Sequence, residues 1–278
     1  MKPFLEPCTP PQYRLECRIS LKLLKTPPKS LTSSTIMTKI TGIIPARYKS
    51  VRFEGKPLAK IGDKTMIQMV YERCLQSELL DRVRVATDDR RIYDSVLSFG
   101  GQAVMTGEDI ATGSDRCCAA VKGEDWDIVV NIQGDEPLID PQVIDTCVRS
   151  LLDAPEAVCS TPVVATTDLD EINSPHAVKV ALNQKIEALY FSRYPIPYNR
   201  KGIEGKTYYK HIGLYCYRKP FLEKYVTMPQ TPLETSESLE QLRMLENGYK
   251  IQCCLVKYES VGVDTKEDLE KVKTLLGV

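Results

Sequence analysis

The sequence predicts an α/β fold with a mixed, mostly parallel sheet flanked by helices. Two observations lead to this prediction. From Ile40 onward, short apolar runs alternate with segments of helical periodicity, a pattern typical of a sheet built from βαβ units. The first run, residues 40–46, is too short and too rich in β-branched residues for a helix, and a cationic loop follows it at once. We therefore expect this run to be a buried parallel strand.

Later apolar runs of similar length predict the remaining strands. Residues 128–132 are apolar enough to lie in the middle of the sheet, whereas residues 158–165 and 177–182 alternate more and favour a mixed extension of it. The strands predicted after the first are residues 83–87, 103–105, 128–132, 158–165, 177–182, 211–217 and 251–256.

Helices are predicted between these strands, from apolar residues at helical spacing and from residues typical of helix ends. Gly100 and Gly101 follow one such segment and end it, and Thr265 precedes the last segment as an N-cap. The predicted helices are residues 66–79, 92–99, 112–121, 143–152, 219–225, 237–247 and 266–275.

Composition excludes several classes of protein. Lysine plus arginine equals aspartate plus glutamate, 37 each among 278 residues, so there is no general positive field for nucleic acid. No apolar run approaches the roughly 20 residues that span a bilayer. The ten cysteines form no C-x-x-C pair and only two histidines are present, which favours a reduced, cytoplasmic setting without disulfides or structural zinc.

Residues 1–36 differ from the rest of the chain. They hold six of the 18 prolines and show no persistent period, so we expect a disordered tail before a folded domain at residues 37–278. Their basic, acid-poor composition is also typical of an organellar transit peptide. We favour an upstream extension, with Met37 as the true start, because the prolines interrupt an amphipathic helix.

The loop after the first strand is the first candidate for chemistry. It carries Arg47, Lys49, Arg52 and Lys56, and Gly55 allows the backbone to approach a ligand closely. The carboxyl end of a strand is where an open α/β sheet binds its ligand, and this charge suits a polyphosphate. The alternative is a solvated basic loop. Neither a Walker P-loop nor a G-x-G-x-x-G pattern is present.

Two carboxylates form the second candidate. Asp135 ends the predicted central strand in Gln-Gly-Asp-Glu-Pro, and Asp264 ends the strand-like run Val-Gly-Val-Asp. Such residues suit Mg²⁺, which takes one or two carboxylates and leaves its other positions to water and phosphate oxygens. The alternatives are a turn carboxylate for Asp135 and a helix cap for Asp264.

The remaining candidates are weaker when taken alone. Small residues at 111–116 precede a helix and expose N–H groups to an anion or a nucleobase edge, although an ordinary cap explains them equally well. Scattered polar residues could together hold an acidic sugar, while each alone is as typical of surface or core: Arg193, His211, Glu237, Glu240 and Gln241.

Together these stretches resemble one family. The runs IIPARYKSVRFEGKPL, VATDD, MTGEDIATGSDR, VVNIQGDEP, ALYFSR, HIGLY, LEQLR and VDTKEDLEKV are similar to those of the 3-deoxy-manno-octulosonate (KDO) cytidylyltransferases, in the family's order over residues 39–273. The resemblance implies a Rossmann-like nucleotidyltransferase fold with a small dimerisation lobe. It also implies a Mg²⁺-dependent homodimer that makes CMP-KDO and pyrophosphate from CTP and KDO, for the lipopolysaccharide core.

The resemblance also implies roles for individual residues. Arg47 and Lys56 match triphosphate-holding, catalytic positions, with Arg52 in the same loop, and Asp135 and Asp264 match the Mg²⁺ ligands. The cytidine side corresponds to Pro45, Ala46, Thr112, Gly113 and Ser114. The positions that match those around KDO are Arg116, Gln133, Arg193, His211, Glu237, Glu240 and Gln241.

One residue departs from the family pattern. Glu54 stands where the family usually has proline, and an acid there either weakens triphosphate binding or points outward. Two other readings stay open: a relative that uses another acidic sugar, such as sialic acid, and a non-catalytic regulator that binds a sugar or nucleotide. His211 is the weaker candidate for a general base.

Overall fold

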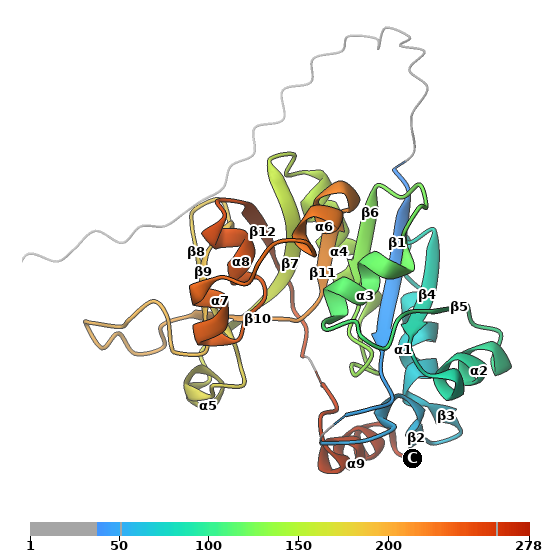
Figure 1. Cartoon of the computed structure of the whole chain (residues 1–278). Helices are drawn as coiled ribbons and strands as arrows, with labels where there is room; N and C mark the ends of the chain where they lie inside the picture. Colours follow the sequence, from blue (N-terminus) through green and yellow to red (C-terminus); the bar gives the residue numbers. More distant parts are fainter. Residues whose placement is uncertain (1–37, 51, 260) are drawn as a thin grey trace, which may run out of the picture. The chain divides into compact units, whose positions relative to one another are not determined.

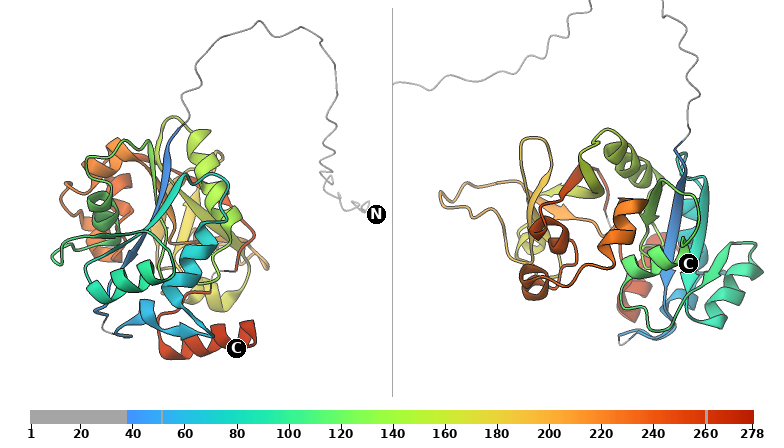
Figure 2. Two further views of the ribbon diagram at one scale, coloured as in Figure 1. Left: turned by 90° about the vertical axis from the view of Figure 1, so that its right-hand side faces the viewer. Right: turned by 45° about the horizontal axis from the view of Figure 1, so that its top comes forward.

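The computed structural model describes residues 38–50, 52–259 and 261–278. The predicted tail, residues 1–36, lies outside the described residues. The described part is built on a ten-stranded mixed sheet with helices on both faces (Figures 1 and 2), which confirms the predicted fold class. A separate two-stranded ribbon, β2 (Lys60–Ile61) and β3 (Lys64–Thr65), follows the short 3₁₀ helix η1 (Lys56–Leu58).

One half of the sheet is parallel. Its strands lie in the order β5 (Ala103–Met105), β4 (Arg82–Thr87), β1 (Ile40–Ala46) and β6 (Ile128–Asn131). Strand β1 pairs with β4 on one side and with β6 on the other, so the order of the strands reverses at β1. Ligands of open α/β sheets bind at such a reversal, beyond the carboxyl ends of the strands. The loops after β1 and β6 therefore meet where a ligand is expected.

The other half is mostly antiparallel and continues the sheet beyond β6. Strand β11 (Tyr215–Arg218) pairs with both β6 and β7 (Ala157–Thr166). Next come β10 (Tyr208–His211), β8 (Lys179–Leu182) and β9 (Ala188–Ser192). Strand β12 (Lys250–Leu255) lies parallel to β7, off this path.

Helices cover both faces of the sheet, because successive side chains along a strand point to opposite faces and are apolar on both. On β1, Ile44 belongs to the core that contains Ile67 of α1 (Met66–Cys74) and Ile144 of α4 (Pro141–Leu152). Its neighbour Ile43 belongs to the core on the opposite face, together with Cys117 of α3 (Gly113–Ala120). Both isoleucines are fully buried, as expected for a central strand with apolar residues at successive positions.

The remaining helices occupy the ends and edges of the sheet. Helices α6 and α8 contribute to the same core as α3, and α9 packs on a small core near β2 (Figure 1). No helix in residues 38–50, 52–259 and 261–278 is long and apolar enough to cross a membrane. The bounds of these helices are α2 (Arg90–Ser98), α5 (Leu169–Asn173), α6 (Lys219–Tyr225), α7 (Pro232–Glu237), α8 (Leu242–Glu246) and α9 (Lys266–Leu276).

Two predicted elements are wrong, and a third, the predicted helix 66–79, ends five residues early, at Cys74. The predicted strand 211–217 is two strands, because the chain turns after His211 and β11 inserts between β6 and β7. The hydroxyl of Thr161 supports this turn by donating to the carbonyls of Ile212, at 3.2 Å, and Leu214, at 2.8 Å. The predicted helix 237–247 is the end of α7, a loop and α8; Ser238 ends α7 in the left-handed conformation, with φ of 52°.

Candidate active site

Four of the predicted residues form one charged cluster beyond the ends of β1 and β6. The ammonium group of Lys56 donates to Asp135 Oδ2 at 2.7 Å and to Asp264 Oδ1 at 3.5 Å. The guanidinium of Arg52 binds both carboxylate oxygens of Asp264, each at 3.1 Å. The structure therefore brings two cations and two carboxylates together from three segments that lie far apart in the sequence. The cluster is named here the phosphate-side cluster.

Local packing explains how these three segments meet. Phe53 of the loop and Val263 share a small core with α9, and the backbone N–H of Val263 donates to the carbonyl of Asp135 at 2.9 Å. Gly55 adopts φ of 70°, and its N–H donates to the carbonyl of Tyr48 at 2.9 Å, which folds the loop back on itself. Thr265 caps α9, so Asp264 is not the cap and its carboxylate remains at the cluster.

The geometry of the phosphate-side cluster fits a divalent cation. Both carboxylates converge on one positive charge, the ammonium of Lys56, and Asp264 is half-exposed to solvent. Among the described residues, no group of three or more His, Cys, Asp and Glu side chains is arranged to hold a metal ion. A site with two carboxylates suits Mg²⁺ because that ion keeps its other positions for water and phosphate oxygens.

Two residues of the cationic loop face away from this cluster. The guanidinium of Arg47 is exposed and donates to the carbonyl of Ile110, in the segment that leads to α3. Glu54 is also exposed. The pKa of Arg91 on α2 is raised, chiefly by its hydrogen bond to Asp89 and to a smaller extent by the charge of Glu54. Glu54 is therefore an outward-pointing acid near α2.

A cavity of about 250 Å³ lies beside the amino end of α3, and we call it the amide-lined cavity. Gly113 and Ser114 contribute one wall, and Pro45 of β1 lies against Gly113, 3.5 Å from the position of a Cβ there. The amide of Gln133 donates to the carbonyl of Gly213 at 2.8 Å and lies in the same wall. The full lining is Gly113, Ser114, Asn131, Gln133, Gly213, Tyr215, Tyr217, Ser238, Leu239, Glu240 and Gln241.

Burial sets the electrostatics of this cavity. Burial raises the pKa of Glu240, and a hydrogen bond to Ser114 opposes that shift. The hydroxyl groups of Ser114 and Tyr217 lie 3.3 Å apart, and burial raises the pKa of Tyr217 well above its usual value. The cavity is therefore lined by neutral hydrogen-bonding groups and one carboxyl, in contrast to the phosphate-side cluster.

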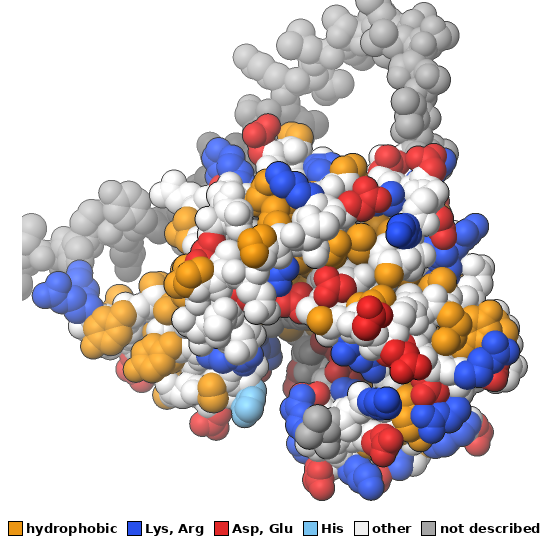
Figure 3. Space-filling view, in the orientation of Figure 1, with side chains coloured by type: hydrophobic (Ala, Val, Ile, Leu, Met, Phe, Trp, Pro, Cys, Tyr) orange, Lys and Arg blue, Asp and Glu red, His pale blue; other side chains and the backbone are white. Residues whose placement is uncertain are grey.

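His211 lines a second cavity, of about 340 Å³, together with Asp135 and Asp264. Gly213 lines both cavities, so the two are neighbours. The Nε2 atom of His211 lies 2.9 Å from the hydroxyl of Thr161, and burial lowers the pKa of His211 to about 3. His211 is therefore neutral near pH 7 and too weakly basic to take a proton efficiently. Figure 3 shows the surface hollowed between the lobe that carries α5 and the region of α9.

Arg193 and Glu237 bind each other rather than an open site. The carboxylate of Glu237 accepts from the hydroxyl of Ser192 at 2.6 Å and from the N–H of Arg193 at 2.9 Å. The guanidinium of Arg193 donates to the carbonyls of Pro175 and Glu237, at 2.9 Å and 2.7 Å. Their role toward a sugar remains a prediction, and their visible role is to support Ser238 and the cavity wall that follows it.

Arg116 lies outside both cavities. Its side chain is fully buried, and its guanidinium donates to Asp88 at 2.7 Å and to the hydroxyl of Thr106. These bonds join α3 to the ends of β4 and β5. Thr112 also has a local role, because it caps α3 in a capping box with Asp115. The structure thus places Arg116 beneath the loops that follow β4 and β5.

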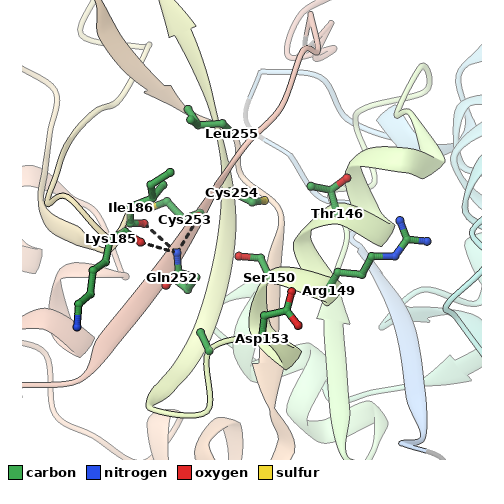
Figure 4. Close-up of a pocket in the computed structure, with 11 residues that line it drawn as sticks. Thr146, Arg149, Ser150, Asp153, Lys185, Ile186, Gln252, Cys253, Cys254 and Leu255 are labelled. Atoms are coloured by element: carbon green, nitrogen blue, oxygen red, sulfur yellow. Dashed lines mark hydrogen bonds between the residues drawn. The ribbon is translucent and has the colours of Figure 1, made fainter. Parts of the chain in front are cut away.

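The largest of the cavities described, about 450 Å³, lies away from all of these residues. It opens between α4 and β12, with Arg149 and Asp153 in one wall and Lys185 and Gln252 in the other (Figure 4). The amide of Gln252 is already bonded to the carbonyls of Lys185, Ile186 and Cys253. Volume alone therefore does not locate the candidate active site.

Sequence reasoning missed several residues of the amide-lined cavity, among them Asn131, Tyr215 and Tyr217. The sequence could have indicated Asn131 as a site residue, because it is an amide at the end of an otherwise apolar strand. Tyr215 and Tyr217 point to a site only once β11 is known to lie beside β6. Their positions depend on the chain turn after His211, which the sequence pattern does not predict.

The order of the strands and the charged cluster at their reversal define the class of fold, a Rossmann-like α/β sheet with a ligand site at the reversal. The model of the cytidylyltransferase family matches residues 41–251. A 3-deoxy-manno-octulosonate cytidylyltransferase from Solibacter usitatus is 49% identical over 237 residues, which cover 85% of this chain and 94% of that protein. Another from Parabacteroides distasonis is 48% identical over 250 residues, covering 86% and 99%.

Solved structures give the same result. The structure of a CMP:2-keto-3-deoxy-manno-octonic acid synthetase complexed with CTP has a TM-score of 0.83 and 43% identity, covering 86% of this chain and 99% of that one. This chain therefore belongs to the cytidylyltransferase family and, within it, to the 3-deoxy-manno-octulosonate cytidylyltransferases.

Proposed function

We propose that this protein transfers CMP from CTP to KDO, releasing pyrophosphate and supplying CMP-KDO for lipopolysaccharide. The observation that carries the proposal is the phosphate-side cluster beside an amide-lined cavity at the reversal of the strand order. The first part suits a triphosphate and a metal ion, and the second suits a polyhydroxylated sugar. Relatives at 49% and 48% identity that carry this name support the choice of substrates.

In the reaction, a hydroxyl oxygen of KDO forms a bond to the α-phosphorus of CTP as the bond to the departing pyrophosphate breaks. The hydroxyl proton is lost to solvent. Negative charge develops on phosphate oxygens, so catalysis requires cations and correct positioning rather than a covalent nucleophile. Arg52 and Lys56 would supply the positive charge, and Arg47 would join them if its guanidinium turned from the carbonyl of Ile110 toward the phosphates.

We propose Mg²⁺ as the metal, with Asp135 and Asp264 as its protein ligands. An ion held there would offset the charge of the phosphate oxygens. The convergence of both carboxylates on the ammonium of Lys56 supports this assignment. Lys56 and Arg52 pair with the two carboxylates in the structure, and a metal ion held there would take over that pairing.

We place the sugar in the amide-lined cavity, with Gln133, Glu240 and Gln241 among its partners, and cytidine on the side of Pro45, Ala46 and Gly113. Gly113 supports the placement, because it lines the cavity and also lies against Pro45 on the proposed cytidine side. No residue acts as a strong general base in this proposal. His211 instead serves as a neutral hydrogen-bonding group near the sugar.

We also propose a homodimer formed through the lobe of α5 and β8–β10. Large apolar side chains gather on this lobe, and a second copy of the chain would cover them (Figure 3). They are Leu169, Leu189, Tyr194, Tyr198 and Ile203, each more than half exposed. We propose the cytoplasm as the setting, which the eight free cysteines among the described residues support. Light scattering coupled to gel filtration tests the dimer.

Pyrophosphate release from the full chain tests the proposed reaction. The assay contains CTP and Mg²⁺ with KDO, with sialic acid or with no sugar. We expect release only with KDO. Release with sialic acid instead identifies the other acidic-sugar activity, and silence with every sugar favours a binding protein over an enzyme.

A further inference from the structure

A lysine lies fully buried in the lobe of α5 and β8–β10. It is Lys179 of β8, whose exposed fraction is 0%. Burying an ammonium group is costly because the group loses its water, so a fully buried lysine is rare unless its charge is compensated. The reaction proposed for this chain does not use Lys179, so its burial calls for another reason.

The hydrogen bonds of Lys179 all go to backbone carbonyls rather than to a carboxylate. Its ammonium donates to the carbonyls of Ser174 and Ala177, at 2.7 Å and 2.5 Å. The third bond goes to the carbonyl of Arg193, at 2.7 Å. An ammonium has three N–H donors, so none is left for a ligand. Lys179 therefore acts on the protein itself and ties the segment before β8 to the end of β9.

The segment that Lys179 binds is a wall of the cavity that contains His211. His176 and Ala177 line this cavity, of about 340 Å³, together with both carboxylates of the phosphate-side cluster. The residue before Lys179 supports His211 as well, because the carbonyl of Val178 accepts from the N–H of His211 at 2.8 Å. The bonds of Lys179 therefore fix the backbone on one side of this cavity.

Arg193 extends the same network to the amide-lined cavity. While Lys179 holds its carbonyl, the guanidinium of Arg193 donates to the carbonyls of Glu237, at 2.7 Å, and Ser238, at 3.3 Å. Ser238 lines the amide-lined cavity. One buried ammonium thus joins a wall of each cavity, and none of its bonds involves the cationic loop or α3.

The three bonds explain why this position holds a lysine. A neutral side chain of the same length would leave three carbonyls without a donor, and the planar guanidinium of an arginine cannot direct three N–H groups from one nitrogen. Burial lowers the pKa of Lys179, and the positive charge of Arg193 adds to that shift, whereas the negative charge of Glu237 opposes it. The chain therefore keeps a costly charge here for the sake of its geometry.

We propose that Lys179 is a positioning residue for the acidic sugar, holding the walls of both cavities at the spacing that the sugar requires. It touches no substrate and acts through the segment 174–177 and through Arg193. This inference rests on the proposed function and extends it to a residue on the far side of the cavity walls.

The test measures steady-state pyrophosphate release by the full chain, with KDO and CTP varied in turn. Lys179→Met keeps the length of the side chain but removes its charge and its donors, whereas Lys179→Arg keeps the charge. Lys206→Met is the matched control. Lys206 lies in the connection between β9 and β10 and donates to the carbonyl of Pro197 at 2.7 Å, but it lines neither of the two cavities.

We expect Lys179→Met to raise the KM for KDO about 10-fold or more, while kcat and the KM for CTP stay within about threefold of wild type. Lys179→Arg should give an intermediate KM for KDO, because a guanidinium meets only some of the three carbonyls. Lys206→Met should match the wild-type chain. A merely structural lysine would instead reduce the amount of folded protein and leave the KM for KDO of the remainder unchanged.

Two results overturn the inference: a KM for KDO within about twofold of wild type in both Lys179 variants, or equal rises in the KM for KDO and for CTP. If Lys179→Met yields no folded protein by circular dichroism, Lys179→Arg decides alone. A wild-type chain that turns over no KDO overturns the proposed function and this inference with it, whereas an active wild-type chain with unchanged variants overturns the inference only.

Discussion

The phosphate-side cluster and the amide-lined cavity are neighbours, yet they prepare for a ligand in opposite ways. In the cluster, Lys56 and Arg52 are already paired with Asp135 and Asp264, and most of these groups remain in contact with solvent. In the cavity wall, Oδ1 of Asn131 and Nε2 of Gln241 are buried and have no hydrogen-bond partner in the described part of the chain. An exposed ion pair contributes little free energy, so its charges exchange partners at little cost. A buried polar group has already lost its water, so a ligand gains binding free energy there only if it offers a matching hydrogen bond. The first arrangement therefore suits phosphates, and the second suits discrimination between sugars.

The largest expected effect comes from removing a carboxylate of the cluster. Asp135→Ala leaves the proposed metal site with one protein ligand, so we expect kcat to fall by about a thousandfold or more. Steady-state pyrophosphate release at saturating Mg²⁺ measures the loss. Asp140→Ala is the matched control, because Asp140 caps α4 away from the cluster. Wild-type activity of Asp135→Ala would exclude its role as a ligand.

A second variant tests whether the cluster and the cavity serve different substrates. Lys56→Ala removes the cation from the cluster, and we expect the KM for CTP to rise about 10- to 100-fold while the KM for KDO changes by about twofold or less. Lys64→Ala, which removes a solvent-exposed lysine paired with Glu72, controls for loss of charge. Equal increases in both KM values would contradict a role specific to phosphate.

The salt concentration tests the same difference between the two regions in the wild-type protein. Because the charges of the cluster are partly exposed, raising NaCl from about 0.05 M to about 0.5 M screens them, and we expect the KM for CTP to rise about threefold or more. The KM for KDO depends in our proposal on the buried polar groups of the amide-lined cavity, and we expect it to change by about twofold or less. A matched rise in both quantities would show that the two regions do not differ in this way.

The smallest expected effect concerns His211 and pH. Burial lowers its pKa from 6.5 to about 3, so between these values the unfolded chain binds a proton that the folded chain does not. His211 therefore stabilises the fold less and less as pH falls from 6.5 toward 3. We expect His211→Gln to lose less thermal stability than wild type between pH 6.5 and 4. His176→Gln, at an exposed histidine, is the control, and parallel losses in all three proteins would count against the assignment.

The sequence predicts the parallel half of the sheet well. Strand β1 matches its predicted bounds, and Lys56 of the loop after it meets Asp135 because parallel strands end at one edge of the sheet. Asp264 joins them as predicted. In this part of the molecule, local patterns and the topology of βαβ units lead to the same arrangement.

The sugar side is less predictable because it depends on irregular backbone. The strand pattern of residues 211–217 does not show the turn that Thr161 supports from β7, fifty residues away. The helical pattern of residues 237–247 contains no glycine or proline where Ser238 ends α7. The burial of Arg116 beneath Asp88 likewise depends on tertiary packing rather than on its motif.

The position of Asp264 has a consequence for the order of events during synthesis. Asp264 lies 208 residues after Lys56 in the chain, and the small core that seats it needs Val263 and α9. The ribosome makes both strands that carry the cationic loop and Asp135 long before these residues appear. A nascent chain therefore holds the complete set of residues for its candidate metal site only when the last helix has been added.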